Sequence, residues 1–398
     1  MSNNEFFQSL EKVVNVEEVA TSMENLGVKL GEDYQPERVL VPNNIDELVA
    51  IVKLANEHKM PLYPIGNGSR FVSGVLPFNE GVLISLGKMA SVIEYRPDNM
   101  SIEVEAGLKV HDLQEILAKD EIFFPINPGK DCTVGGLIAT NAYDHKKFLY
   151  KTTRFYVMGM EYISPQGEVI KVGGRTIKNV SSYDLHQLLT GSWGTLGIIT
   201  KAILRVKPLP EKIVLLDCLT QDYNELLNII DFILFKEKTN LASLVFEQLD
   251  SGFFVQVGLE GFAKTIELQE KALQNNFNFK KSQTVSIDFT KANGQLALPL
   301  KNYLVGIKQV LEVLKQYPDI KVKGNATSGL IYLGVLDIKN ILLELTKITE
   351  TLEGDFVFNQ ESLTRKDKGF GLTKLLKDIK NKVDPNHVLV PSSRVMKE

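Results

Sequence analysis

The stretch that most constrains the fold is Pro61-Leu62-Tyr63-Pro64-Ile65-Gly66-Asn67-Gly68-Ser69-Arg70. Met60 to Ile65 predicts a short buried strand, and small residues form the loop after it. Two glycines on either side of Asn67 allow left-handed backbone conformations without a Cβ clash. Successive N–H groups in such a loop can turn inward together and bind an anion. This loop alone leaves open a second interpretation, a plain strand-to-loop turn.

A strand–helix–strand unit delivers this loop. Residues 37–41 predict a strand, and Asn44 predicts the N-cap of a helix because Glu47 follows three residues later. The apolar stripe expected to be buried on this helix is Ile45, Leu48, Val49, Val52 and Ala55. The loop lacks G-x-G-x-x-G, so the unit does not have the Rossmann fingerprint.

Composition limits the class of protein. A chain of 398 residues is long enough for two or three domains, and a net charge of −4 gives no reason to expect nucleic acid as a partner. Two distant cysteines, Cys132 and Cys218, exclude a disulfide framework and are too few for an iron–sulfur cluster. We see no secretion signal and no apolar run of the ~18 residues that a membrane span needs. We therefore expect a cytoplasmic protein, with attachment to the inner membrane face through partners as an alternative.

The chain predicts four consecutive parts. Residues 1–35 predict a helical lead-in, because Val13, Val16, Val19 and Met23 have helical spacing. In residues 36–210, two β-hairpins are expected, around residues 97–99 and 165–167. Residues 211–355 predict an α+β domain on one open sheet, since long apolar helices alternate there with strands. Residues 356–398 contain one further helix and a C-terminal segment.

Two more glycine-bearing segments follow the first loop. The second is Thr133-Val134-Gly135-Gly136, continuing through Ala139-Thr140-Asn141-Ala142. The third is Gly191-Ser192-Trp193-Gly194-Thr195-Leu196-Gly197. Each segment is a weak signal because loops with glycine are common, but the three in this order and spacing are a strong one.

In these three segments the chain resembles the FAD-binding module of the vanillyl-alcohol-oxidase/para-cresol-methylhydroxylase (PCMH) superfamily, and most of all the flavin subunits of glycolate oxidase and D-lactate dehydrogenase. Residues 383–391 also resemble the closing segment of that family, which returns to the FAD domain. The resemblance implies an α+β fold, with a PCMH-type FAD-binding module of two subdomains and an α+β cap domain with an open antiparallel sheet.

The resemblance also implies which residues bind FAD. Backbone N–H groups of the first loop would hold the pyrophosphate, and the second and third segments would line the path of the ribityl chain and the isoalloxazine ring. The residues expected to bind FAD are Ile65, Gly66, Asn67, Gly68, Ser69, Arg70, Thr133, Gly135, Gly136, Ala139, Thr140, Asn141, Gly194, Gly197, Ile198 and Ile199.

Two departures from the family pattern bear on how FAD is held. Some relatives bind FAD covalently through a His in the first loop, where Ser69 and Arg70 stand here. Others use a Cys, but Cys132 lies only three residues before Gly135, closer than that arrangement suggests. We expect noncovalent FAD. Trp193 stands where many relatives carry Glu, with consequences that the sequence does not predict.

The cap lacks the histidines that metal-using relatives carry. Asn325 and Tyr332 stand at the positions where the family pattern places histidines, and none of the five His of this sequence lies in the cap. We therefore expect no metal site, since imidazole is the ligand that such a site would need. The sequence in this respect is similar to the accessory flavin subunit of glycolate oxidase complexes.

Oxidation of a 2-hydroxy acid requires a cation for the carboxylate, a base for the hydroxyl proton and a hydride acceptor. Catalytic candidates are Lys178, Tyr183 and Arg154, ahead of Arg70, Arg175, Tyr143 and His145. An alternative is that Lys178 and Tyr183 only brace the FAD loop.

We thus expect an FAD-dependent dehydrogenase subunit that oxidises a small 2-hydroxy acid, such as glycolate or D-lactate, and passes electrons to an iron–sulfur partner. The alternative is a non-catalytic subunit whose FAD relays electrons within such a complex, beside a second flavoprotein. A third possibility is a superfamily member that acts on another alcohol or a sugar acid, and a fourth is an unrelated glycine-rich binding protein.

Overall fold

A computed structural model describes residues 3–14, 20–21, 38–68, 81–129, 131–174, 184–237, 239–282, 287, 294–334, 341–358, 361–362 and 370–389. The chain divides into two compact units. Unit 1 consists of Met1–Asp144, Thr152–Leu209 and Gly369–Glu398, and unit 2 of His145–Lys151 and Pro210–Lys368. The cap domain expected at 211–355 thus corresponds to a unit that also takes up a short segment from the first half of the chain.

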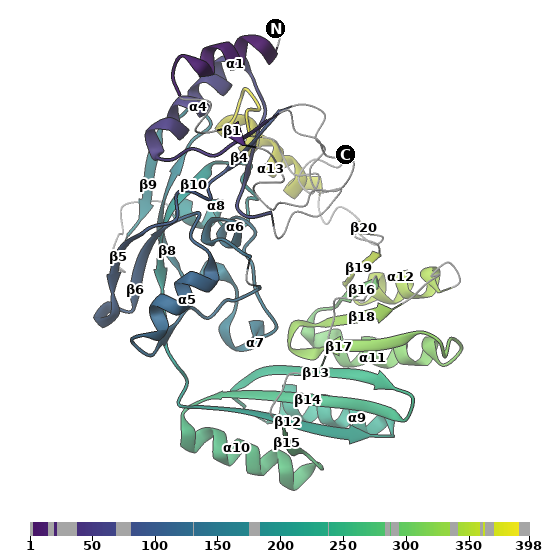
Figure 1. Cartoon of the computed structure of the whole chain (residues 1–398). Coiled ribbons are helices and arrows are strands. Elements are labelled where there is room, and N and C mark those ends of the chain that lie inside the picture. The colour runs from purple at the N-terminus through teal and green to yellow at the C-terminus, as the bar shows by residue number, and fades with distance from the viewer. Residues whose placement is uncertain are drawn as a thin grey trace. The chain divides into compact units, whose positions relative to one another are not determined.

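Unit 1 is built on two main sheets (Figure 1). The first has the strand order β1-β2-β4-β3, in which β2, β4 and β3 are parallel and β1 is antiparallel. The second is antiparallel throughout, with the order β5-β6-β10-β8-β9. The strands are β1 (Ala20–Thr21), β2 (Arg38–Leu40), β3 (Leu62–Ile65), β4 (Val82–Ser85), β5 (Val92–Arg96), β6 (Ser101–Glu105), β8 (Val157–Ile163), β9 (Val169–Gly173), β10 (Ile198–Arg205) and the small pair β7 (Ile122–Phe123) and β11 (Lys207–Pro208). The helices are α1 (Asn3–Glu11), α4 (Ile45–His58), α5 (Val110–Ala118), α6 (Val134–Ala139), α8 (Leu185–Leu189) and α13 (Phe370–Val383), with 3-10 turns at Pro97–Asn99 and Thr153–Phe155.

Local sequence explains where helix α4 begins. The side chain of Asn44 accepts a hydrogen bond from the backbone N–H of Glu47 at 3.0 Å, and the Glu47 carboxylate accepts one from the N–H of Asn43 at 2.8 Å. These contacts satisfy donors that the first turn of a helix leaves unpaired. The expected buried stripe is confirmed at Leu48, Val52 and Ala55 and corrected elsewhere, because Ile51 is buried while Ile45 and Val49 are only half-buried.

The two predicted hairpins are confirmed, but the helical lead-in is wrong in part. β5 pairs with β6 and β8 with β9, each antiparallel. At the N-terminus the helix ends at Glu11, and Ala20 and Thr21 pair with Leu40 and Val39 as a strand. Val13 is exposed, so its helical spacing marks no buried face. Val16, Val19 and Met23 lie outside the described residues.

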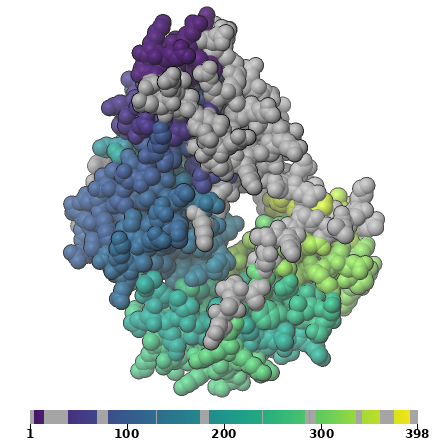
Figure 2. Space-filling view, viewed as in Figure 1, coloured from purple at the N-terminus to yellow at the C-terminus, as the bar shows by residue number. Residues whose placement is uncertain are grey.

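Helix α1 packs on α4 within unit 1. The ring of Phe6 meets the ring of His58 edge-on, with centroids 6.1 Å apart. In the space-filling view (Figure 2) the purple side chains of this helix lie at one end of the unit. The N-terminal helix is therefore part of the core of unit 1, since Phe6 and Leu10 are fully buried.

Unit 2 is one open antiparallel sheet, as expected, and its longer helices pack on one face of that sheet (Figure 1). The order is β15-β12-β14-β13-β17-β18-β16-β19-β20. Its core consists of inward residues of alternate strand positions, such as Val255, Val257 and Leu259, packed against the helices. The strands are β12 (Lys212–Thr220), β13 (Leu241–Leu249), β14 (Gly252–Gly261), β15 (Lys280–Ser282), β16 (Gly294–Ala297), β17 (Lys321–Asn325), β18 (Leu330–Gly334), β19 (Asp355–Phe358) and β20 (Glu361–Ser362). The helices are α7 (Lys147–Tyr150), α9 (Tyr223–Asp231), which continues as a π-helix over Phe232–Lys236, α10 (Ala263–Asn276), α11 (Leu300–Leu314) and α12 (Leu342–Thr351), with a 3-10 turn at Ala326–Ser328. None of the helices in the described ranges has the length and apolar content needed to cross a membrane.

A buried carboxylate in the second sheet of unit 1 makes its stability depend on pH. Burial alone would raise the pKa of Glu161, but hydrogen bonds from Lys201 and Thr200 and the charges of Lys201 and Lys171 outweigh burial and lower this pKa. A lowered pKa in the folded state stabilises the fold above the ordinary value of 4.5, and this contribution disappears as the pH falls through the folded pKa.

We therefore expect Glu161→Gln to lower the free energy of unfolding at pH 7 by about 1–2 kcal/mol. This difference from wild type should shrink as the pH falls below 4.5. Urea unfolding of both proteins at pH 7 and at pH 4 checks this, with the exposed Glu168→Gln as control. A difference that stays constant with pH would contradict the assignment.

Candidate cofactor site

All three glycine-bearing segments meet at one pocket in unit 1. The first segment reaches it at the end of β3, the second at the start of α6, and the third just before β10. The residues that line the pocket are Pro64, Ile65, Gly66, Leu86, Ala106, Thr133, Gly135, Gly136, Ala139, Gly194, Gly197, Ile198 and Ile199. The structure therefore brings together ten of the residues that the sequence predicted to bind FAD.

Backbone hydrogen bonds hold the second and third segments at the pocket. The N–H of Gly135 donates to the carbonyl of Ala106 at 2.8 Å, and the N–H of Ala106 donates to the carbonyl of Thr200 in β10 at 2.8 Å. The N–H of Trp193 donates to the carbonyl of Ala139, also at 2.8 Å. Trp193 has a φ of 59°, which places a bulky residue in the left-handed region of the third turn. These contacts tie the two segments to each other and to the antiparallel sheet.

Glycine is required at these turns because protein atoms lie where a Cβ would stand. A Cβ on Gly66 would lie 2.1 Å from Thr133 Oγ1, so the first segment touches the second. A Cβ on Gly194 would lie 2.7 Å from Pro64 Cγ, so the third touches the first, and Gly194 also has a φ of 75°. The glycines thus allow the three segments to approach each other closely, in addition to leaving space for a ligand.

The chemistry of the lining suits a flat, largely apolar group. Among the described residues that line the pocket, none carries a charge, and the one side-chain hydroxyl, on Thr133, accepts a hydrogen bond from the N–H of Gly136 at 3.2 Å. The first N–H groups of α6 are also used, since those of Val134 and Gly135 donate to Leu108 and Ala106. This wall fits the isoalloxazine ring of a flavin better than its phosphates, which need donors or cations. The donors for the phosphates are expected in the first loop, where Gly68 has a φ of 68°.

Other predicted residues lie beside the pocket or outside the described ranges. Thr140 uses its hydroxyl within α6, donating to the carbonyl of Gly136 at 2.8 Å, and Asn141 accepts from the N–H of Arg154 at 3.0 Å. Asn67 and Gly68 follow the lining residue Gly66 directly. Ser69, Arg70, Arg175, Lys178 and Tyr183 lie outside the described residues.

Leu86 and Ala106 line the pocket but were missed in the sequence. Leu86 follows β4, and Ala106 follows β6 at the position where a strand ends before Gly107. The sequence signal that could have identified them is Ala106-Gly107, where the strand ends. A Cβ on Gly107 would lie 2.0 Å from the carbonyl oxygen of Leu86, so this break brings the two residues together.

The Arg154 guanidinium is occupied by protein oxygens. It donates to the carbonyl of Gln187, to the carbonyl of Thr190 and, at 3.2 Å, to the side-chain oxygen of Gln187. Thr190 directly precedes the third glycine segment. This geometry supports a bracing function for Arg154, because a substrate carboxylate would have to compete with these contacts.

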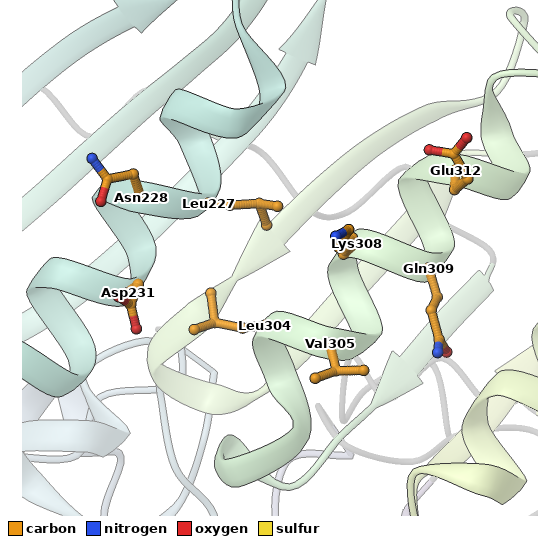
Figure 3. A pocket seen from close by; sticks show the side chains of 8 residues that line it. All are labelled: Leu227, Asn228, Asp231, Leu304, Val305, Lys308, Gln309 and Glu312. Atoms are coloured by element: carbon orange, nitrogen blue, oxygen red, sulfur yellow. The ribbon is translucent and has the colours of Figure 1, made fainter.

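A second hollow lies in unit 2, between helices α9 and α11 (Figure 3). Leu227 and Leu304 point into the space between the two helices, and Asp231, Lys308 and Glu312 lie around it. The described residues that line this groove all belong to α9 and α11 and include no glycine. We assign the cofactor to the pocket of unit 1.

Residues 36–173 match a family described as an FAD binding domain. This part of the chain is therefore an FAD-binding domain of the PCMH type, and FAD is its cofactor. The expected FAD and fold class are thereby confirmed, while the contacts of individual residues with FAD stay predictions.

Relatives of known name agree with this class. The chain is 35% identical over 216 residues to a D-lactate dehydrogenase of Anaerostipes hadrus, covering 51% of this chain and 46% of the relative. It is 41% identical over 171 residues to a D-lactate dehydrogenase of Archaeoglobus fulgidus, covering 43% and 38%. It is 34% identical over 178 residues to the glycolate oxidase subunit GlcD of Bacillus subtilis, covering 44% and 38%. Each match thus spans less than half of the relative's length.

Solved structures share the fold across nearly the whole chain. An alkyldihydroxyacetonephosphate synthase superposes with a TM-score of 0.75 at 15% identity, covering 98% of this chain and 85% of the other. The 4-ethylphenol oxidase of Gulosibacter chungangensis superposes with a TM-score of 0.74 at 15% identity, covering 98% and 97%. At this identity the comparison shows a common fold.

Proposed function

We propose that this chain is an FAD-linked oxidoreductase subunit that oxidises a small 2-hydroxy acid such as glycolate or D-lactate. The observation that carries the proposal is the convergence of three glycine turns on one uncharged pocket, in a module similar to those of D-lactate dehydrogenases and a glycolate oxidase subunit. When bound, FAD supplies a hydride acceptor at its N5 position. The protein would supply the site that holds the ring.

The cofactor would be held without a covalent bond. Cys132 directly precedes the pocket residue Thr133, and it is buried with its thiol 3.8 Å from the carbonyl oxygen of Thr133. A buried thiol behaves as a small apolar group.

Lys178 and Tyr183 remain our candidates for the chemical step. A 2-hydroxy acid presents a carboxylate, which a lysine ammonium can bind, and a hydroxyl proton, which a base must accept. Arg154 is the weaker candidate because its guanidinium already contacts Gln187 and Thr190. We give it a bracing function at the third turn.

We propose an iron–sulfur subunit, or a second flavoprotein subunit, as the partner that takes up the electrons. The GlcD relative is by its name one subunit of glycolate oxidase, which supports a complex. The sequence contains two cysteines, too few to supply all the thiolate ligands of an iron–sulfur cluster.

A relay function without substrate is the second candidate, and the cap favours it. Asn325, which stands where metal-using relatives place a His, is buried and accepts hydrogen bonds from Thr327 Oγ1 at 2.7 Å and from the N–H of Ser328 at 3.1 Å. In the described part of the chain, no group of three or more His, Cys, Asp or Glu could hold a metal ion. Without a metal, binding of a 2-hydroxy acid would depend on lysine and arginine.

Anaerobic mixing of the FAD-loaded chain with glycolate, D-lactate, L-lactate and D-2-hydroxyglutarate tests the two candidates. We expect one acid to bleach the visible flavin band. The Lys178→Met variant should retain its flavin. The same acid should reduce that flavin about 10²–10⁴-fold more slowly than in wild type, the range for loss of a positioned catalytic group. If dithionite bleaches the flavin and none of the acids does, the dehydrogenase proposal is wrong and the relay function is supported.

A further inference from the structure

A buried ion pair lies within the C-terminal segment, and its lysine also contacts the third glycine segment. Lys380, in the last turn of α13, contacts Asp384 Oδ2 at 2.6 Å, and their side chains are 3% and 0% exposed. The Lys380 ammonium also donates to the carbonyl of Thr195 at 2.7 Å and to the carbonyl of Leu389. Its three N–H groups therefore all have partners.

The aspartate holds the other side of this arrangement. Asp384 Oδ1 accepts from the N–H of Val388 at 2.9 Å, and Oδ2 accepts from the N–H of Leu389 at 2.8 Å. Burial lowers the pKa of Lys380 below its ordinary value, and the hydrogen bond and charge of Asp384 offset this lowering only in part. Removing a charged pair from water costs desolvation free energy, so a buried pair is weak evidence for a function in stability alone.

The contacts of Lys380 lead to two of the three glycine segments. Thr195 lies in the third segment, directly after Gly194, on which a Cβ would lie 2.7 Å from Pro64 Cγ of the first segment. Leu389 lies beside β3, since it forms a β-bridge with Leu62 of that strand. The N–H of Leu62 also donates to the carbonyl of Val388 at 2.7 Å. β3 ends at Ile65 and Gly66, which line the pocket. One ammonium group thus connects the third turn to the strand that carries the first.

We propose that Lys380 is a positioning residue that sets the third glycine turn against the first at the spacing that FAD requires. The proposal rests on FAD binding at this pocket and adds a residue that lies outside the pocket lining. Lys380 need not contact FAD to have this function. A residue that only stabilised the fold would not alter FAD affinity once the protein was folded.

The test separates positioning from stability by three variants of the full chain. Lys380→Met removes the donors and leaves Asp384 buried without its cation, so we expect loss of stability and weaker FAD binding. Lys380→Met/Asp384→Asn removes both charges and should regain much of the stability, but the carbonyls of Thr195 and Leu389 still lack their donor. The dissociation constant of FAD for this double variant should stay about tenfold to a hundredfold above wild type, the effect of losing a hydrogen bond to a charged group. Asp384→Asn keeps Lys380 and should lose stability while retaining wild-type FAD affinity.

Thermal unfolding of each apoprotein gives its stability, and titration with FAD below the unfolding temperature gives its dissociation constant for FAD. Lys382→Met, an exposed lysine on the same helix, is the matched control and should change neither. Wild-type affinity in the double variant would overturn the proposal, because the pair would then serve the fold alone. Weakened affinity in Asp384→Asn equal to that of Lys380→Met would also overturn it. If the double variant does not fold, FAD affinity is compared between Asp384→Asn and Lys380→Met; weaker FAD binding in Lys380→Met alone supports the proposal, and equal affinities overturn it. Failure of wild type itself to bind FAD would instead refute the cofactor site.

Discussion

Gly66→Ala should yield a folded protein that has lost most of its FAD. The new Cβ would lie 2.1 Å from Thr133 Oγ1 and 3.2 Å from Thr133 Cβ, distances at which the first and second segments must separate. Because both segments line the pocket, their separation changes its shape. We expect the dissociation constant for FAD to rise at least about a hundredfold, about 2.7 kcal/mol of binding free energy. The visible absorbance of the purified protein and a titration of the apoprotein measure this.

Two further variants show whether the clash is the cause. Gly87→Ala is the matched control, since the nearest atom to its Cβ would be Ser85 Oγ at 3.4 Å, an ordinary contact. In Gly66→Ala/Thr133→Ala the hydroxyl is gone, so part of the FAD affinity should return. Full flavin content in Gly66→Ala would show that the first two segments do not form the cofactor site as described.

Phe356→Ala should destabilise unit 2 by about 3–5 kcal/mol, the cost typical of removing a fully buried aromatic side chain. Phe356 lies in β19 with no exposed surface and belongs to the core between the sheet and its helices. The described residues that line the FAD pocket all belong to unit 1. We therefore expect far-UV circular dichroism to report an early unfolding step of unit 2, at a temperature at which flavin absorbance is still that of the bound form.

Val357→Ala is the control for this prediction. Val357 lies next in the same strand on the opposite face and is only partly buried. Its substitution should cost clearly less, because less apolar area is lost. Release of FAD in the same step as the unfolding of unit 2 would contradict the expectation, and would mean that the two units unfold as one.

Local sequence rules predicted the elements around the cofactor site well. The Asn44 cap, the two hairpins and the open antiparallel sheet of unit 2 follow from capping and from the alternation of apolar residues. The three glycine segments were also recognised, because no side chain other than hydrogen allows such turns to approach closely. These signals act over a few residues and are therefore visible in a single sequence.

The remaining features depend on contacts between distant residues. Leu86 and Ala106 follow ordinary strands, and only the packing of Gly107 against the carbonyl oxygen of Leu86 brings them to the pocket. The spacing of Val13 to Met23 predicted a helix, but pairing of Ala20 and Thr21 with β2 overrides this local preference. The contact of Lys380 with Thr195 could not be predicted either, since Thr195 lies 185 residues away in the sequence.

The segment 145–151 has a practical consequence for engineering. In unit 2, Tyr150 donates a hydrogen bond to the buried carboxylate of Glu260 at 2.7 Å, and Lys146 forms an ion pair with the same carboxylate. A chimera that grafts the cap of a relative onto this flavin module by exchanging residues 210–368 alone would separate Glu260 from both partners. Such a graft should carry residues 145–151 with it, and the pair of swaps, with and without these seven positions, would show how strongly the two stretches depend on each other.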